Sequence, residues 1–167
     1  MKVIFLDVDG VINTAKKRNH LERVNKTIGW NYCYNNIFCK RSLNNLMEIV
    51  LMTDANIVIS SARRYKQDLS QALKLQFIEY GLWDYTLSKT PVVDENLKHD
   101  AGKELEINAW MEEHKDIESF VILDDFIAVF DKLLPNVIEV NPHEGINMKV
   151  RLQAIEKLNE VNGGIDK

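Results

Sequence analysis

Two aspartates separated by one residue follow the first hydrophobic segment of the chain. Residues 2–6 form a short apolar run, as in a strand that is buried on both faces, and Asp7 and Asp9 come directly after it. Side chains at positions i and i+2 of an extended chain point to the same side, so the two carboxylates can converge on one ligand. Gly10 permits the sharp turn that leaves the strand. The structural alternative is an Asp-x-Asp-Gly turn or helix cap.

Two nearby carboxylates repel each other and need a cation or a shared proton. Magnesium takes oxygen ligands and often binds one or two carboxylates together with a substrate phosphate. Aspartate is also a nucleophile in aspartyl-phosphate chemistry. The pair Asp7 and Asp9 therefore predicts a site where a metal neutralises phosphate charge while one carboxylate attacks phosphorus.

Hydroxyl and basic side chains follow a second apolar segment. Residues 56–60 end in Ser60, and Ser61 and Arg63 come next. Hydroxyl, backbone N–H and guanidinium groups at this position would hydrogen-bond phosphate oxygens. The alternative for the serines is an N-cap of the following helix.

A second acidic pair, Asp124 and Asp125, follows the apolar residues 119–123. One carboxylate could complete a metal site while the other orients a ligand or water. A cap for the segment that begins at Phe126 would explain only one of the two.

Lys103 lies near the start of a predicted helix, where its charge opposes the helix dipole. An ammonium beside the phosphate and the nucleophile would stabilise developing negative charge. The alternatives are an ordinary surface lysine, or Lys98 in the same role.

The elements that must position these side chains alternate between two patterns. Strand-like runs occupy residues 2–6, 56–60, 119–123 and 136–140. Helical periodicity occupies residues 42–54, 66–80, 103–115 and 147–161, and Ser42 is the predicted cap of the first of these helices. Alternating strands and helices predict a parallel sheet covered on both sides, with ligands at the carboxyl ends of its strands.

Composition limits the class of protein. A chain of 167 residues with 46% apolar residues suits one domain over residues 1–167. Its formal charge of −4 provides no broad footprint for nucleic acid, but it leaves room for a local basic patch. The C-x5-C spacing of Cys33 and Cys39 does not match a zinc site and predicts reduced thiols. No apolar stretch approaches a membrane span and no signal peptide is visible, so we expect a cytoplasmic protein without membrane contact.

Two long connections, residues 13–39 and 81–102, interrupt the alternation and are expected to be lid-like. The first carries aromatic and basic residues: Trp30, Tyr32, Tyr34, Phe38, Lys16, Lys17, Arg18, Arg23 and Lys26. The aromatic rings could stack on bases while the cations bind phosphates. Alternatively, a small lid packs its own aromatic residues onto the domain.

The ordered set of motifs resembles the haloacid dehalogenase-like (HAD) superfamily of phosphohydrolases. The four motifs of that superfamily are similar to Asp7-Val8-Asp9-Gly10, Ser61, Lys103 and Asp124-Asp125. A narrower likeness is to the HAD domains named after the Swiss Army Knife RNA-repair proteins. It is carried by Phe5 to Asn13, Ser60 to Arg63, Thr90-Pro91, Gly102 to Glu104 with Trp110, Ile122 to Asp125, and Gly145-Ile146. Residues 14–40 resemble nothing recognised, and Ala62 stands where that family often has Trp.

The resemblance implies a Rossmann-like three-layer α/β sandwich with a mainly parallel sheet and a minimal cap or none. It implies that Asp7 is the nucleophile and a magnesium ligand. Asp9 would protonate the leaving oxygen and then act as base on water, and its backbone carbonyl would bind the metal. Ser61 would hold the phosphoryl group and Lys103 would balance charge.

The resemblance also implies that Asp124 and Asp125 complete the metal site, with Asp125 favoured as the direct ligand. Gly10, Ser60 and Arg63 are the further candidates for substrate binding. Polynucleotide 3′-phosphatases of the same superfamily share the Ser-x-Arg pattern, so a nucleic-acid end is a candidate substrate beside small phosphate monoesters.

The sequence thus predicts a magnesium-dependent phosphohydrolase that acts through a phospho-aspartate. A phospho-receiver domain gathers similar groups, but it carries its phosphorylated aspartate after the third strand and its lysine later, so the order of motifs here disfavours it. A catalytically inactive phosphate-binding module is disfavoured because no motif residue is missing.

Overall fold

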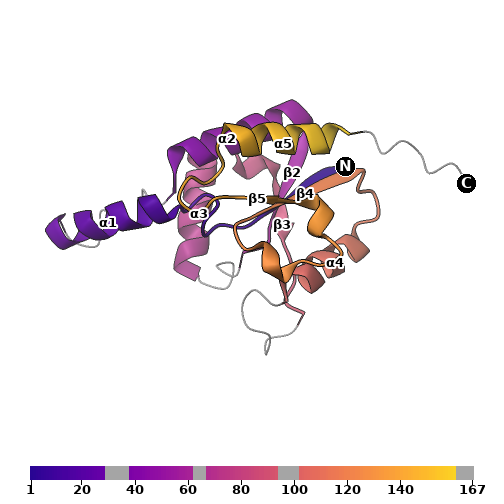
Figure 1. Cartoon of the computed structure of the whole chain (residues 1–167), viewed down its shortest axis with the longest axis horizontal. Helices are drawn as coiled ribbons and strands as arrows, with labels where there is room; N and C mark the ends of the chain where they lie inside the picture. Colours follow the sequence, from indigo (N-terminus) through magenta and orange to yellow (C-terminus); the bar gives the residue numbers. More distant parts are fainter. Residues whose placement is uncertain (29–37, 62–66, 94–101, 161–167) are drawn as a thin grey trace, which may run out of the picture.

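The protein is described by a computed structural model over residues 1–28, 38–61, 67–93 and 102–160. A single five-stranded sheet forms its centre (Figure 1). The strands are β1 (Lys2–Leu6), β2 (Ala55–Ile59), β3 (Thr86–Lys89), β4 (Ser119–Asp124) and β5 (Val137–Glu139). They lie in the order β3-β2-β1-β4-β5, and every neighbouring pair is parallel. The predicted α/β class and parallel sheet are confirmed.

Helices cover both faces of the sheet, as expected for a Rossmann-like fold. The α-helices are α1 (Ala15–Ile28), α2 (Lys40–Thr53), α3 (Gln67–Glu79), α4 (Lys103–Glu113) and α5 (Met148–Asn159). Three short 3₁₀ helices are η3 (Trp83–Tyr85), η4 (Ile127–Val129) and η5 (Leu134–Asn136). The described residues contain no separate cap domain, and no described helix has the length and hydrophobicity to cross a membrane.

The alternation of side chains along β1 explains why residues 3–6 are all apolar. Ile4 and Leu6 point to the layer that contains α2, α3 and α5. Val3 and Phe5 point to the opposite layer, where Trp110 of α4 packs edge-on against Phe5 with ring centroids 5.4 Å apart. Since neither face of the strand contacts water at residues 3–6, polar side chains are disfavoured there, and the one lysine of β1 lies at its half-buried first position.

One strand was not predicted from the sequence. β3 lies inside the long connection 81–102, and it consists of Thr-Leu-Ser-Lys at the edge of the sheet. Its first residue is half-buried and the next three are exposed, so it lacks the apolar run that identifies a buried strand.

The predicted N-cap at Ser42 is wrong. Helix α2 begins two residues earlier, after Cys39, whose backbone N–H donates to the carbonyl of Ile12 over 2.7 Å. Ser42 is buried inside the helix, and its hydroxyl accepts a hydrogen bond from the N–H of Ile146. The Ser42 hydroxyl therefore serves a tertiary contact with Ile146, and not the helix N-cap that the local sequence predicted.

The first long connection contains the α1 helix, which extends beyond the body of the domain (Figure 1). Trp30, Tyr32 and Tyr34 lie outside the described residues, so their role stays a prediction. Phe38 is buried in the hydrophobic core beside α2. The alternative that the connection packs its aromatic residues onto the domain is therefore confirmed for Phe38. Because Phe38 is buried, it cannot stack on a base.

Gly145 and Gly81 have similar φ angles but different surroundings, and Gly145 packs against the loop that follows β1. At Gly145 (φ +68°) a Cβ atom would lie 2.3 Å from Ser42 Oγ and 2.6 Å from the carbonyl oxygen of Val11. At Gly81 (φ +71°) the nearest atom would be Met47 Cε at 3.5 Å. Both Ala variants carry backbone strain, but only Gly145→Ala adds overpacking.

We therefore expect Gly145→Ala to lower the free energy of unfolding by about 1–3 kcal/mol more than Gly81→Ala does. Urea unfolding of the two variants measures this difference. Equal losses would show that the contact between residue 145 and the Val11 loop is not tightly packed.

Candidate active site

The candidate residues lie at the carboxyl edge of the sheet. Beyond the strand ends, the N–H of Asp7 donates to Leu123 and the N–H of Ser60 donates to Leu6, each over 3.0 Å. These bonds continue the parallel register, in which Leu6 lies opposite both Ile59 and Leu123. The positions that follow three different strands are thereby fixed side by side by backbone geometry.

Three carboxylates form the centre of the site. Asp7, Asp124 and Asp125 each contribute one oxygen atom, and these oxygens all lie within 4.8 Å of one another. Asp7 and Asp124 are buried, and Asp125 is half-buried. A group of hard oxygen donors at this spacing can hold a divalent cation such as magnesium.

Lys103 is buried against two of these carboxylates. Its Nζ lies 2.7 Å from Asp124 Oδ2 and 3.3 Å from Asp7 Oδ1, and its side chain is 3% exposed. The alternative of a surface lysine is therefore wrong, while Lys98 lies outside the described residues. Lys103 begins α4 and shares one helix face with Ile107 and Trp110, which pack against the sheet. The helix thus places an ammonium at the sheet edge despite the opposing dipole.

The electrostatics of the cluster favour protonation of its acids. Burial, together with the nearby charge of Asp124, raises the pKa of Asp7 from 3.8 to about 6, although Lys103 and a hydrogen bond from Ser61 oppose the shift. Burial also raises the pKa of Asp124 against the influence of Lys103, and it raises the pKa of Asp125 with help from Asp7. One ammonium is not enough for three carboxylates, and a bound divalent cation would supply the missing positive charge.

Asp124 and Asp125 have different surroundings. Asp124 Oδ2 accepts from Lys103, and its Oδ1 accepts from the N–H of Phe126 over 2.9 Å. Asp124 is thus the aspartate that holds the start of the segment at Phe126, although η4 itself has no side-chain cap. The carboxylate of Asp125 lies so close to Gly10 that a Cβ there would be 2.1 Å from Asp125 Oδ2. Gly10, with φ at +82°, therefore provides both the turn and the space for Asp125.

Asp9 lies at the rim of the site, and its carboxylate has other partners. Asn13 Nδ2 donates to Asp9 Oδ1 over 2.8 Å, and Arg18 Nη1 lies 3.3 Å from the same oxygen. The Asp9 side chain is 37% exposed. The turn that closes through hydrogen bonds from Ile12 and Asn13 to Val8 separates the environments of Asp7 and Asp9.

The remaining candidates are the serines and the arginine after β2. Ser60 and Ser61 are both buried, and the hydroxyl of Ser61 donates to Asp7, whereas Arg63 lies outside the described residues. Sequence reasoning did not identify Asn13 and Arg18 as partners of Asp9. The i+4 spacing of Asn13 from Asp9 was the available signal for one of them.

A comparison with protein families gives a match over most of the chain. The model of the HAD domain in Swiss Army Knife RNA repair proteins matches residues 3–150. This range contains every residue of the carboxylate cluster and Lys103. Neither curated proteins nor solved structures gave a match to this chain.

The raised pKa of Asp7 predicts a pH dependence of stability in protein freed of metal with EDTA. Because the folded state binds the proton more tightly than the unfolded chain does, the contribution of Asp7 to the free energy of unfolding falls as the pH rises from 3.8 to about 6. Over this pH range we expect the free energy of unfolding of the wild type, relative to that of Asp7→Asn, to fall by about 1–3 kcal/mol.

Urea unfolding of both proteins at several pH values measures that difference. Saturating Mg²⁺ should reduce the fall, because the cation binds only the deprotonated carboxylate. Parallel stability curves for the two metal-free proteins would contradict the raised pKa.

Proposed function

The chain belongs to the family of HAD domains in Swiss Army Knife RNA repair proteins, and from this premise we propose that it is a magnesium-dependent phosphohydrolase that cleaves phosphate monoesters through a phospho-aspartate. The observation that carries the proposal is the buried cluster of Asp7, Asp124 and Asp125 with Lys103 between two of its members. This cluster combines a nucleophile, a set of oxygen ligands and a fixed positive charge.

Asp7 attacks phosphorus with one carboxylate oxygen, and the bond between phosphorus and the ester oxygen breaks. Asp9 donates a proton to that leaving oxygen. A water molecule then attacks the phospho-aspartate while Asp9 takes its proton, which releases phosphate and restores Asp7. The half-exposed position of Asp9 at the rim suits a group that must reach both the leaving alcohol and the water.

The other residues hold the phosphoryl group and balance its charge. Ser61, whose hydroxyl contacts Asp7, would bind a phosphoryl oxygen, and Ser60, Gly10 and Arg63 would add contacts. Lys103 balances the charge that develops on the phosphoryl oxygens. Magnesium, when bound, would neutralise phosphate charge and orient the phosphoryl group for attack.

The carboxylates fit this metal because they are hard oxygen donors with an excess of negative charge. Asp7, the backbone carbonyl of Asp9 and Asp125 would be the direct ligands. Both oxygens of Asp124 already accept hydrogen bonds, from Lys103 and from Phe126, which supports Asp125 as the ligand and Asp124 as the residue that positions Lys103.

The proposed substrate is a phosphorylated nucleotide or nucleic-acid end. The matched family is named for RNA repair, and the described residues leave the site without a cap domain that would exclude a large substrate. We also propose that residues 1–167 act as one domain, with the connections 13–39 and 81–102 beside the substrate entrance.

Activity on p-nitrophenyl phosphate tests the chemistry. We expect repeated turnover with Mg²⁺, loss of turnover with EDTA, and no turnover by Asp7→Asn. Asp9→Asn should lower kcat by about 10²–10⁴-fold for an alkyl phosphate, whose leaving group needs a proton. With p-nitrophenyl phosphate the same variant should accumulate phosphorylated enzyme, because its leaving group departs readily and only the second step suffers.

Circular dichroism shows whether each variant is folded. Stable phosphorylation of the wild type without turnover would favour the phospho-receiver alternative. Kinetics unchanged by Asp9→Asn would remove Asp9 from the mechanism.

Variants of the neighbouring Asp124 and Asp125 test which of the two binds the metal directly. Asp125→Asn should raise the Mg²⁺ concentration needed for half-maximal activity. The increase should exceed the about 10–100-fold that is typical when a residue that only hydrogen-bonds to a metal ligand is lost, because Asp125 would bind the metal directly. Asp124→Asn should have a smaller effect on that concentration and a larger effect on stability, since it leaves Lys103 with one carboxylate. Isothermal titration with Mg²⁺ and urea unfolding measure the two effects, and the reverse ranking would assign the direct ligand to Asp124.

A further inference from the structure

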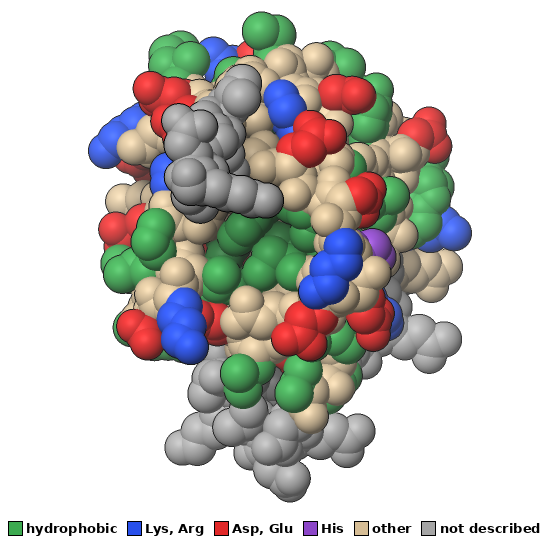
Figure 2. All heavy atoms as spheres, turned by 90° about the vertical axis from the view of Figure 1, so that its right-hand side faces the viewer, with side chains coloured by type: hydrophobic (Ala, Val, Ile, Leu, Met, Phe, Trp, Pro, Cys, Tyr) green, Lys and Arg blue, Asp and Glu red, His purple; other side chains and the backbone are tan. Residues whose placement is uncertain are grey.

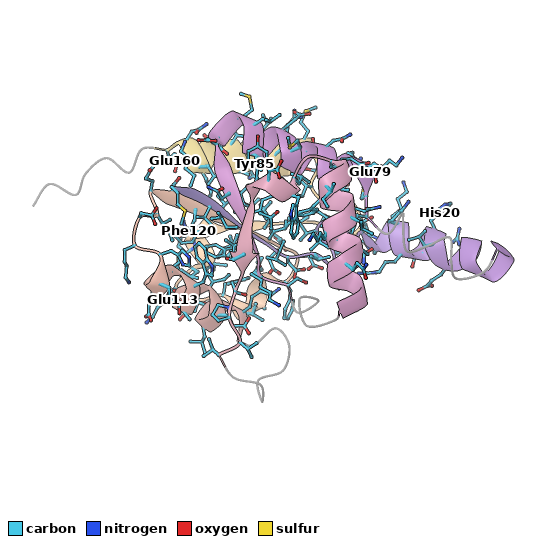
Figure 3. The ribbon with its side chains drawn as sticks, turned by 180° about the vertical axis from the view of Figure 1, so that it is seen from behind. His20, Glu79, Tyr85, Glu113, Phe120 and Glu160 are labelled. Carbon is cyan, nitrogen blue, oxygen red and sulfur yellow. The ribbon has the colours of Figure 1, made fainter. Side chains whose placement is uncertain are left out.

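Positive charge is concentrated in one segment of an otherwise acidic chain. Residues 14–41 contain seven Lys and Arg residues and a single Glu, whereas the whole chain has a formal charge of −4. Most of the segment that is described is the α1 helix, which extends beyond the body of the domain (Figures 1 and 3). The catalytic cluster does not explain this concentration of charge.

One face of α1 is exposed and basic. Leu21 is the buried side chain on the described part of the helix. Lys16, His20 and Arg23 follow one another at i, i+4 and i+7, so they share a face, and all three are exposed. His20 lies on the part of α1 that extends beyond the domain (Figure 3). The face is therefore available to a partner from outside.

The helix starts directly at the candidate active site. The hydroxyl of Thr14 accepts from the N–H of Lys17 over 3.2 Å, and the N–H of Ala15 donates to the carbonyl of Pro142 over 2.7 Å. Arg18 then bridges the helix and the site through its ion pair with Asp9. The inner end of α1 is thus anchored beside the carboxylates.

The start of α2 adds positive charge on the same loop. Lys40 and Arg41 are exposed in its first turn, and the N–H of Cys39 holds this turn to the carbonyl of Ile12. Cations from two helices therefore surround the loop that follows β1.

We propose that the exposed basic face of α1, with Arg18 at its inner end, binds the sugar-phosphate backbone of a nucleic-acid strand whose terminal phosphate lies at Asp7. This inference rests on the proposed phosphohydrolase function and adds the surface that selects its substrate. A helix of 14 residues is about 21 Å long, enough to follow a strand over several nucleotides. A row of cations at helical spacing suits a polyanion with regularly repeated charges better than it suits a single phosphate.

Arg18 exchanges partners when the strand binds. In the free protein it pairs with Asp9, and both side chains are partly exposed, at 41% and 37%. An ion pair between two partly exposed side chains is weak, so a phosphodiester group can displace Asp9 from it. The exchange frees the carboxylate of Asp9 to face the leaving oxygen. A strand frees it more often than a small monoester does, because only the strand offers Arg18 a second phosphate.

The test compares two double variants that remove the same charge. Lys16→Gln with Arg23→Gln alters the basic face of α1. Lys115→Gln with Lys157→Gln is the control, because these lysines line a cavity at the start of β4, beyond the opposite edge of the sheet, together with Glu118 and Glu160. Figure 2 shows the end of the molecule away from α1, where side chains of both signs are interspersed. Thermal unfolding establishes that all proteins are folded.

Binding of a fluorescent single-stranded oligonucleotide with a 3′-phosphate is measured by anisotropy at several salt concentrations, in an Asp7→Asn background. We expect the α1 variant to bind at least tenfold more weakly than the control, with a salt slope smaller by about 0.7 for each lost phosphate contact. Equal affinities and slopes would overturn the proposal, and so would a phosphopeptide that binds as tightly with the same dependence on α1.

The kinetic arm uses proteins with Asp7 intact. The α1 variant should lose more kcat/KM on the 3′-phosphorylated oligonucleotide than on p-nitrophenyl phosphate, and equal losses on both would overturn the proposal. Arg18→Ala should lower the ratio of kcat/KM on the oligonucleotide to kcat/KM on p-nitrophenyl phosphate, and Arg18→Lys should restore part of that ratio. If neither substrate is hydrolysed by the wild type, the phosphohydrolase function fails, and the binding arm still decides whether α1 holds a strand.

Discussion

The site depends on one unbalanced interaction, the burial of Lys103 between Asp7 and Asp124 with Asp125 close by. One ammonium cannot neutralise three carboxylates, and burial deprives Asp7 and Asp124 of water. The folded protein therefore holds a local excess of negative charge, which protons or a divalent cation must offset. The raised pKa values of the acids and their capacity to hold a cation are two results of the same shortage of positive charge.

The hydrophobic layer beneath α4 keeps this arrangement in place. Trp110 packs edge-on against Phe5 of β1, and its indole N–H donates to the hydroxyl of Ser88 over 2.8 Å. These contacts fix α4 against the sheet through β1 and β3, and Lys103 lies two turns before Trp110 on the same helix face. The ammonium is thus positioned by apolar packing as well as by its ion pairs. A buried charge held in this way needs little reorganisation when charge develops on a substrate.

Asp7 and Asp9 show how one short loop gives two acids different roles. Asp7 is buried beside Lys103 and Ser61, whereas Asp9 is partly exposed beside Asn13 and Arg18. The turn that closes on the carbonyl of Val8 separates the two environments within a few residues. In the proposed reaction the buried acid acts on phosphorus, and the rim acid exchanges protons with groups that arrive from solvent. Arg18 connects that rim to a basic helix, so the proposed substrate selection and the proposed proton transfer share one contact.

The sequence by itself determined the strands that are buried on both faces, because only apolar residues fit there. It also determined that Asp7, Asp124, Asp125 and Ser61 follow such strands, since parallel strands bring their carboxyl ends to one edge. Local pattern could not find β3, whose edge position permits exposed residues. It misassigned Ser42, because the hydroxyl serves a contact with Ile146, more than a hundred positions away in the chain.

Only the tertiary structure decided how the candidate side chains divide their roles. Whether Lys103 is a surface residue or a buried partner depends on the packing of α4, and the separate uses of the two Asp124 oxygens depend on Lys103 and Phe126 together. The pairing of Arg18 with Asp9 depends on the direction in which α1 leaves the sheet. Residue type and spacing specify which chemistry is available, but distances of a few ångströms between side chains from different elements are set by packing across the whole domain.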